Sequence, residues 1–383
     1  MRLSRRSEID PFIVMDVMDA AARAEAEGRH IIHMEVGQPG TPAPKNARLA
    51  LADAMERNAL GYTLALGIPE LRARIALLYR SRYGVDLSPE RVIVTAGSSG
   101  AFLLAFTALF EAGDRVALGA PGYPSYRQIL RALSLVPADV ETRAEDRYQP
   151  VPDLLPDGIK GLIVASPANP TGTMLDRPAL AALMDAASER NAHFISDEIY
   201  HGLEYRRPAV TALEVSDDVC VINSFSKYFS MTGWRVGWMI VPEAHVRTIE
   251  RLAQNMFICA SHASQVAALA AMDCDDELRR NVETYRANRD LMIKGLADCG
   301  FDRIAPPDGA FYVYADVARF TDDSRAFAGE ILDQAGVAVT PGVDFDKARG
   351  GHTIRFSYAR STPDIEEGLA RLRRFMESRD VAA

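Results

Sequence analysis

The sequence predicts an α/β protein with a large, mostly parallel sheet and a smaller α+β domain formed by both ends of the chain. Between about residues 90 and 240, short β-branched runs alternate with Ala- and Leu-rich helical segments. These runs are apolar on both faces, as strands are in a parallel sheet that helices cover on both sides. The last hundred residues have a different sequence pattern, with shorter predicted strands and charged helices.

The elements can be placed in order along the chain. Residues 11–28 have the pattern of an amphipathic helix that ends at Gly28. The predicted central strands are "RVIVT", "DRVAL", "GLIVAS", "AHFIS", "DVCVINS" and "WMIV", with helices such as 101–112 and 178–191 between them. A long charged helix is expected at 275–300, and it is followed by the strands "AFYVYADV", "GVAVT" and "TIRFSYA" and a closing helix. We expect a large domain over residues 48–283 and a small domain made of residues 1–47 and 284–383.

Composition excludes several classes of protein. The 383 residues are 48% hydrophobic and 25% charged, which is ordinary for a globular enzyme. A net charge of −9 argues against nucleic acid as a partner. No apolar segment approaches the roughly 18 residues that a membrane span requires. The four cysteines are far apart and the histidines lack metal-ligand spacing, so we expect reduced thiols, no metal site and a cytoplasmic location.

The residues that follow the strands are the candidates for chemistry, because ligands of open α/β sheets bind outside the carboxyl ends of the strands. Gly97, Ser98, Ser99 and Gly100 follow the first central strand and can bring several N–H groups to one point at a helix N-terminus. Phosphate is the usual occupant of such an anion site. A tight turn between strand and helix is the structural alternative.

Three further strands end at polar or aromatic residues. Tyr123, between a glycine and a proline, can offer a flat face to a planar ring, or it is an ordinary turn aromatic. Asn169 stands in the rigid loop "SPANPTG", where its amide can donate to a ligand oxygen or the loop can simply cap a helix. Asp197 ends an apolar strand, and a buried carboxylate there requires a positive partner. A structural ion pair is the alternative for Asp197.

Lys227 follows the next strand, within "SFSKYFSMTGWRVGW". A lysine that acts as nucleophile and base needs a lowered pKa, which a neighbouring cation such as Arg235 can supply. Arg235 can also hold a phosphate with two hydrogen bonds, and Ser224 and Ser226 add hydroxyl donors. Together with the residues above, this set describes what pyridoxal 5′-phosphate requires.

These motifs resemble the class I/II aminotransferases, a fold type I family. Residues 224–237 fit the lysine signature of that family at every position. "GIPELR", "NPTG", "DEIY" and "TIRFSYA" occur in the family's order and approximate spacing. The resemblance covers essentially the whole chain and implies a seven-stranded large domain.

The resemblance also implies a role for each site residue. Lys227 would form the internal aldimine and move protons, and Asp197 would pair with the pyridinium nitrogen. Asn169 and Tyr200 would hold the phenolic oxygen. The other implied contacts are Tyr123 on the ring, Gly97, Ser98, Ser99, Ser224, Ser226 and Arg235 around the phosphate, Tyr62 on the phosphate of the neighbouring subunit in a homodimer, and Arg355 and Gly37 at the substrate α-carboxylate.

Two features depart from the family pattern. Phe345 is followed by Asp346, where a Phe-Gly pair is common, so this loop is expected to sit differently. No second arginine is clearly assignable to a distal carboxylate, because solvated surface positions are the favoured interpretation for Arg127, Arg251 and Arg349. The preference for a substrate side chain is therefore open.

The favoured function is a ping-pong aminotransferase that moves an amino group from an L-amino acid to a 2-oxo acid. The same fold and cofactor also serve β-lyases of the cystathionine or cysteine-conjugate type, which the cofactor site cannot separate from aminotransferases. A ligand-sensing regulatory domain is a third alternative. Regulators of that kind carry an N-terminal DNA-binding domain, for which there is no room before residue 30.

Overall fold

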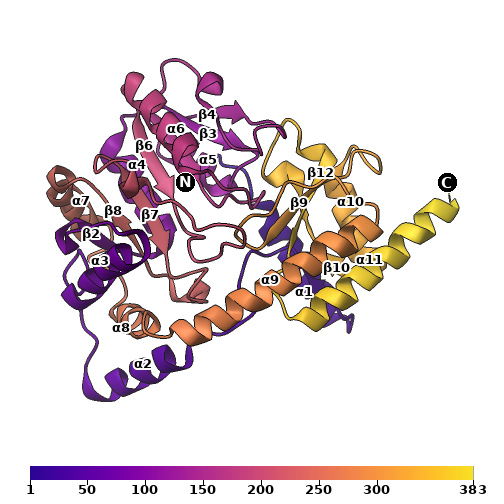
Figure 1. Cartoon of the computed structure of the whole chain (residues 1–383), viewed down its shortest axis with the longest axis horizontal. Coiled ribbons are helices and arrows are strands. Elements are labelled where there is room, and N and C mark those ends of the chain that lie inside the picture. Colours follow the sequence, from indigo (N-terminus) through magenta and orange to yellow (C-terminus); the bar gives the residue numbers. More distant parts are fainter. Residues whose placement is uncertain (383) are drawn as a thin grey trace.

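A seven-stranded sheet forms the centre of the computed structural model, which describes residues 1–382 (Figure 1). The strand order is β2-β8-β7-β6-β5-β3-β4. Six of these strands run in one direction and β8 runs opposite to them, so the prediction of a mostly parallel sheet is confirmed. The strands are β2 (Val92–Thr95), β3 (Arg115–Ala120), β4 (Val136–Glu141), β5 (Gly161–Ala165), β6 (His193–Asp197), β7 (Cys220–Ser224) and β8 (Gly237–Ile240).

The extent of burial explains why six strands could be predicted from the sequence and β4 could not. Every residue of β2, β7 and β8 is buried, as their continuous apolar runs require. The edge strand β4 was not among the predicted runs. Its buried positions, Ala138 and Val140, alternate with the exposed positions Asp139 and Glu141, so the strand has no continuous apolar run.

Helices cover both faces of this sheet. Ile163 of β5 packs in one hydrophobic cluster with residues of α4, α5 and α7, whereas Leu162 and Val164 belong to a second cluster with residues of α3, α6 and α8. This division follows the alternation of side chains along a strand. The six helices are α3 (Pro69–Tyr83), α4 (Gly97–Leu109), α5 (Pro124–Ala132), α6 (Arg177–Glu189), α7 (Glu243–Met256) and α8 (His262–Ala271).

The two ends of the chain meet outside the large sheet. β1 (Ile32–His33) pairs in parallel with β10 (Val337–Ala338), and an antiparallel sheet has the order β11-β12-β9. The long helix α9 leads from the large sheet to these elements and packs against α11 (Figure 1). The remaining elements are α1 (Ile13–Ala26), α2 (Lys45–Arg57), α9 (Asp275–Asp298), β9 (Tyr312–Asp316), α10 (Ser324–Glu330), β11 (Thr340–Pro341), β12 (Thr353–Ser357) and α11 (Thr362–Ala382). The domain boundaries at residues 48 and 284 stay a prediction.

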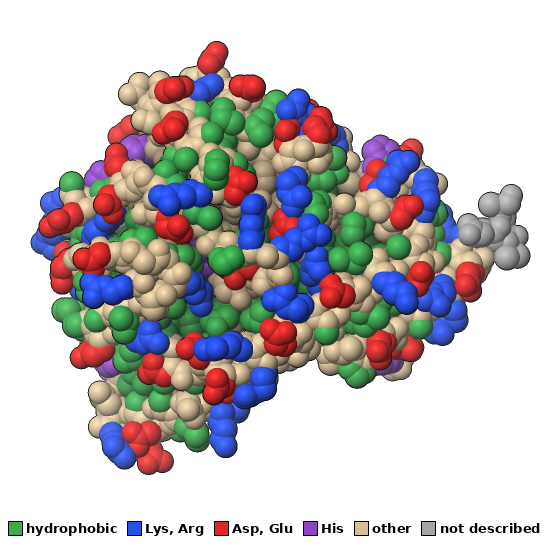
Figure 2. Space-filling view, in the orientation of Figure 1, with side chains coloured by type: hydrophobic (Ala, Val, Ile, Leu, Met, Phe, Trp, Pro, Cys, Tyr) green, Lys and Arg blue, Asp and Glu red, His purple; other side chains and the backbone are tan. Residues whose placement is uncertain are grey.

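The surface carries charges of both signs. Lysine and arginine side chains are interspersed with aspartate and glutamate over the face seen in Figure 2. None of the helices within residues 1–382 combines the length and the hydrophobicity that a bilayer span requires. The same residues contain no group of three side chains placed to ligate a metal ion.

Candidate active site

A cavity of about 220 Å³ lies at the carboxyl ends of β5, β6 and β7 and is closed by segments from both chain ends. This is the edge of the sheet at which the sequence predicted chemistry. The predicted site residues that line the cavity are Gly37, Ser98, Ser99, Tyr123, Asn169, Asp197, Tyr200, Ser226, Lys227, Arg235 and Arg355.

Lys227 lies just beyond β7, with its amine in this cavity. Nζ donates a hydrogen bond to the carbonyl oxygen of Gly37 at 2.5 Å and lies 5.7 Å from the ring centre of Tyr200. Burial, and then the positive charges of Arg355 and Arg235, lower the pKa of Lys227 from 10.5 to about 7. An amine with this pKa is available near neutral pH as a nucleophile and as a base.

Asp197 is the last residue of β6 and is buried at the bottom of the site. Its carboxylate accepts hydrogen bonds from the hydroxyl of Tyr126 and, at 3.0 Å, from the backbone N–H of Ile199. Burial raises the pKa of Asp197 to about 6, against the opposing effects of these hydrogen bonds and of Lys227. A cation placed against this carboxylate would stabilise its charged form.

The first turn of α4 and Arg235 form one corner of the cavity. Ser98 and Ser99 lie at the N-terminus of α4, where unpaired N–H groups attract an anion. Gly97 precedes them with a φ of +69°, and a Cβ at this position would lie 2.5 Å from Nη2 of Arg235. The close approach of the guanidinium to the helix N-terminus therefore depends on this glycine. Nη1 of Arg235 donates to the carbonyl of Thr232 at 3.0 Å.

Ser224 and Ser226 lie at different depths. Ser226 lines the cavity, while Ser224 is 1% exposed and its hydroxyl oxygen is 2.8 Å from that of Ser226. Ser224 therefore contacts Ser226 and does not line the cavity itself. Gly97 also lies behind the lining, and Tyr62, 82% exposed, is on the outer surface.

Arg355, in β12, lies between two aromatic rings, with its guanidinium carbon 4.4 Å from the ring centre of Tyr312 and 4.7 Å from that of Phe345. Nη1 donates to Oδ1 of Asn169 at 2.8 Å, and Nη2 donates to the carbonyl of Glu35. This bond leaves the amide nitrogen of Asn169 for a ligand. The buried Nε of Arg355 has no hydrogen-bond partner among the described residues.

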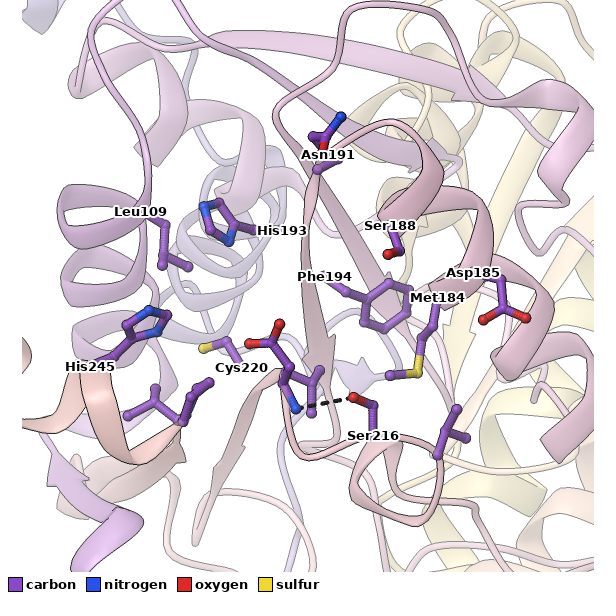
Figure 3. Close-up of a pocket in the computed structure, with 16 residues that line it drawn as sticks. Leu109, Met184, Asp185, Ser188, Asn191, His193, Phe194, Ser216, Cys220 and His245 are labelled. Atoms are coloured by element: carbon purple, nitrogen blue, oxygen red, sulfur yellow. Dashed lines mark hydrogen bonds between the residues drawn. The ribbon is translucent and has the colours of Figure 1, made fainter.

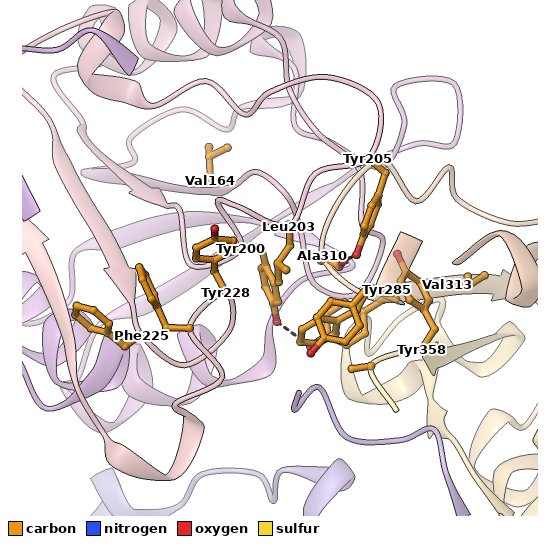
Figure 4. Packing of buried hydrophobic residues seen from close by; sticks show 14 of the residues in the cluster. Val164, Tyr200, Leu203, Tyr205, Phe225, Tyr228, Tyr285, Ala310, Val313 and Tyr358 are labelled. Carbon is orange, nitrogen blue, oxygen red and sulfur yellow. Dashed lines mark hydrogen bonds between the residues drawn. The ribbon is translucent and has the colours of Figure 1, made fainter. Parts of the chain in front are cut away.

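Aromatic side chains orient the remaining site residues. The Tyr200 and Tyr312 hydroxyls are 2.7 Å apart, and Tyr200 lies among buried rings that include Tyr285 (Figure 4). The ring of Tyr123 meets that of Phe12 edge-on, with the centroids 5.8 Å apart. Tight packing of this kind limits the rotamers that Tyr123 and Tyr200 can adopt.

The lining residues that were not predicted from the sequence are Phe12, Val14, Met15, Val36, Gln38, Tyr126, Ala165, Ile199, Thr232 and Tyr312. Tyr126 stands three residues after Tyr123, so the helical spacing of the pair was a usable signal. The N-terminal residues gave no local signal, because they reach the cavity only through tertiary contacts.

The expectation of solvated surface positions for three arginines is wrong for Arg127. This side chain is 3% exposed and pairs with Asp139. Arg349 is partly buried and bonds to Asp346, and Arg251 is exposed on α7. None of the three lines the cavity.

A second and larger cavity, of about 590 Å³, lies at the opposite edge of the sheet, where β6 and β7 begin. Figure 3 shows His193 and His245 on one side of it and Met184 and Asp185 on the other. No lysine or arginine lines this cavity. It therefore lacks the cations that an anionic cofactor requires.

Comparison with known proteins places the chain among aminotransferases. The family "Aminotransferase class I and II" matches residues 29–372. A valine–pyruvate aminotransferase of Mycobacterium tuberculosis is 46% identical over 98% of this chain and 99% of the relative, and an aspartate aminotransferase of Thermotoga maritima is 34% identical over 98% and 100%. A solved structure from Silicibacter pomeroyi is 66% identical, covers 99% of this chain and 100% of its own, and superposes with a TM-score of 0.94.

Proposed function

This chain belongs to the class I and II aminotransferase family, and we propose that it holds pyridoxal 5′-phosphate in the cavity around Lys227 and transfers amino groups there from an L-amino acid to a 2-oxo acid. Transamination is the activity that its relatives carry. The β-lyase alternative is not favoured by these relatives. The observation that carries the proposal is the amine of Lys227. Its pKa is lowered to about 7, and the charged residues around it suit the charges of the cofactor.

The charges of the cavity fit this cofactor. Its charged lining residues are three cations, Lys227, Arg235 and Arg355, and one carboxylate, Asp197. Arg235, Ser98 and Ser99 would hold the phosphate at the N-terminus of α4. Asp197, buried and with a raised pKa, is the natural partner for a protonated ring nitrogen. The amide nitrogen of Asn169 and the hydroxyl of Tyr200 would serve the phenolic oxygen, with Tyr123 on the ring face.

When bound, pyridoxal 5′-phosphate supplies an electron sink for the bond that breaks at the substrate Cα. The Nζ of Lys227 takes the Cα proton and returns a proton to the product, which its pKa near 7 permits at neutral pH. The guanidinium of Arg355 binds the α-carboxylate, and it keeps its direction because the rings of Tyr312 and Phe345 hold it. Gly37 offers backbone groups on the same side.

A homodimer is part of the proposal, with Tyr62 reaching the phosphate in the partner's site. Tyr62 is 82% exposed, and Leu64 and Ile258 nearby are also exposed. The backbone N–H of Thr63 contacts the sulfur of Cys259 at 3.5 Å, so these apolar side chains belong to adjacent segments of one surface. A second copy of the chain would remove them from water.

A cytoplasmic location is the other part of the proposal. It is supported by the four cysteines, which are all free in the described residues. Proteins of oxidising compartments more often pair such residues.

A single-turnover experiment tests the proposed reaction. The purified enzyme, loaded with pyridoxal 5′-phosphate, is mixed with an excess of an L-amino acid and no 2-oxo acid. We expect one equivalent of 2-oxo acid per site and then no further product, with none from Lys227→Ala. Continuous turnover in the absence of an acceptor would contradict transamination.

A further inference from the structure

The cavity continues past the residues that would hold the cofactor, to the start of α1. Phe12, Val14 and Met15 line it here, together with Val36 and Gln38 from the segment after β1. None of these five residues carries a charge. They are the lining residues from the first forty positions of the chain apart from Gly37.

Polar contacts at two places fix the start of α1 to the rest of the molecule. The carboxylate of Asp344 accepts hydrogen bonds from the backbone N–H groups of Ile13 at 3.0 Å and Val14 at 3.3 Å. Three residues before Ile13, Asp10 accepts from Arg131 at 2.9 Å and also pairs with Lys347. The segment that carries the apolar lining therefore has a defined position over the cavity.

Phe12 connects this segment with the cofactor region. Its ring packs edge-on against Tyr123, with an angle of 81° between the ring planes. Tyr123 is the side chain proposed to lie on the cofactor ring. Arg355 lines the same cavity, so a substrate whose α-carboxylate is held by Arg355 would lie in the space that the start of α1 also lines.

Each positively charged side chain of the cavity already has a proposed partner. Lys227 and Arg235 belong to the cofactor site, and Arg355 is the one that remains for the α-carboxylate. Arg355 also donates to Asn169 and to the carbonyl of Glu35. A second carboxylate on the substrate would find no positive partner among the described lining residues, and burying an unpaired charge is costly.

We propose that Phe12, Val14 and Met15 form the subsite for the substrate side chain, and that the enzyme takes amino acids and 2-oxo acids with uncharged, apolar side chains. This inference rests on the proposed function. The same subsite must accept the donor and the acceptor in turn, so pyruvate is favoured over 2-oxoglutarate. With valine as donor the balanced reaction is L-valine plus pyruvate to 3-methyl-2-oxobutanoate plus L-alanine, and no oxidant is needed.

The inference is tested first on the wild-type enzyme loaded with pyridoxal 5′-phosphate. We expect kcat/KM for L-valine with pyruvate to exceed kcat/KM for L-aspartate with 2-oxoglutarate by about tenfold or more, the scale set by apolar side-chain recognition. Equal or faster reaction of the acidic pair would overturn the apolar subsite while the proposed transamination stands. If no pair of substrates reacts, the proposed function fails, and this inference fails with it.

A pair of charge variants then locates the subsite. Met15 is 53% exposed, so Met15→Arg and Met15→Glu are both compatible with folding. We expect Met15→Arg to raise the ratio of kcat/KM for aspartate over valine by about tenfold through a new favourable charge contact, and Met15→Glu to leave or lower it. Ala22→Arg, exposed on the same helix and outside the cavity lining, is the matched control and should leave the ratio unchanged. Equal ratios in the two Met15 variants would overturn the assignment.

Discussion

Lys227 owes its chemistry to its surroundings. The side chain is removed from bulk water and faces Arg355 and Arg235, and both effects disfavour the charged amine. The neutral form, which can attack a carbonyl carbon, is therefore present near neutral pH. An exposed lysine would reach this form only near its ordinary pKa of 10.5.

The first prediction concerns the pH dependence of cofactor capture. Because the pKa of Lys227 is about 7, the second-order rate constant for uptake of pyridoxal 5′-phosphate by the apoenzyme should rise about tenfold from pH 6 to pH 8 and then level off. Stopped-flow absorbance measures this rate. Arg355→Gln removes one of the charges that lower the pKa, so its profile should move to higher pH. A wild-type profile that keeps rising to pH 10 would contradict the assignment.

The second prediction concerns Glu198, which is next to Asp197 and 1% exposed. One of its oxygens accepts from the hydroxyls of Ser196 and Thr211 and from the N–H of Ala212. Burial nonetheless raises the pKa of Glu198 from 4.5 to about 8. The folded state therefore binds this proton more tightly than the unfolded state, and the resulting stabilisation, complete below pH 4.5, is lost as the pH rises through 8.

Glu198→Gln removes this titration while keeping an oxygen acceptor for the same donors. We expect the melting temperature of the wild type, measured relative to the variant, to fall by roughly 2 °C or more between pH 5 and pH 9. Differential scanning calorimetry of both proteins across this range measures the difference. A difference that is constant with pH would show that Glu198 ionises normally.

At the scale of elements, the candidate site depends on the turns that connect strands to helices. Gly97 begins α4 with a positive φ, which brings the helix N-terminus and the guanidinium of Arg235 into contact. Both are sources of positive potential, so an anion in this corner is attracted by two elements at once.

The third prediction tests this contact. Gly97→Ala should weaken the affinity for pyridoxal 5′-phosphate by about tenfold, because the new Cβ displaces Arg235 and strains the left-handed backbone. Gly233→Ala is the control, since nothing lies within 4 Å of its added Cβ and its loop is adjacent to Arg235. Fluorescence titration of the apoproteins gives both affinities. Equal losses in the two variants would contradict a specific role for Gly97.

Much of this architecture was predictable from local sequence. The continuous apolar runs predicted six of the seven central strands, and the residues that follow them line one cavity. Tyr126 and Arg127 show what local sequence patterns do not predict. Tyr126 bonds to Asp197, 71 positions away, and Arg127 is buried against Asp139. Helical spacing could have placed Tyr126 beside Tyr123, but the partners Asp197 and Asp139 are set by tertiary packing, which this spacing does not reveal.

On the scale of the whole molecule, both chain ends complete a site whose floor is the central sheet. Arg355 comes from β12, Phe12 from the start of α1 and Lys227 from the turn after β7. The sequence identified Arg355 through its motif, but the position of Phe12 depends on Asp344, far away in the chain. The N-terminal part of the site therefore could not be predicted from local patterns.

The fourth prediction concerns the proposed dimer. Tyr62→Ala and Lys227→Ala should each be nearly inactive on their own. If Tyr62 serves the partner's site, a mixed dimer of the two variants contains one site with both wild-type residues, so unfolding and refolding the two together should restore activity. Assays of the mixture against each variant alone measure this. No recovery from a mixture that forms dimers would place Tyr62 outside the partner's site.

The most direct test of transamination follows the amino group itself. The loaded enzyme is given ¹⁵N-labelled L-valine and unlabelled pyruvate, and the products are analysed by NMR. We predict that the label appears in L-alanine in amounts equal to the 3-methyl-2-oxobutanoate formed, with parallel lines in double-reciprocal plots and no product from Lys227→Ala. Label released as ammonium, or product formed by Lys227→Ala, would contradict the account.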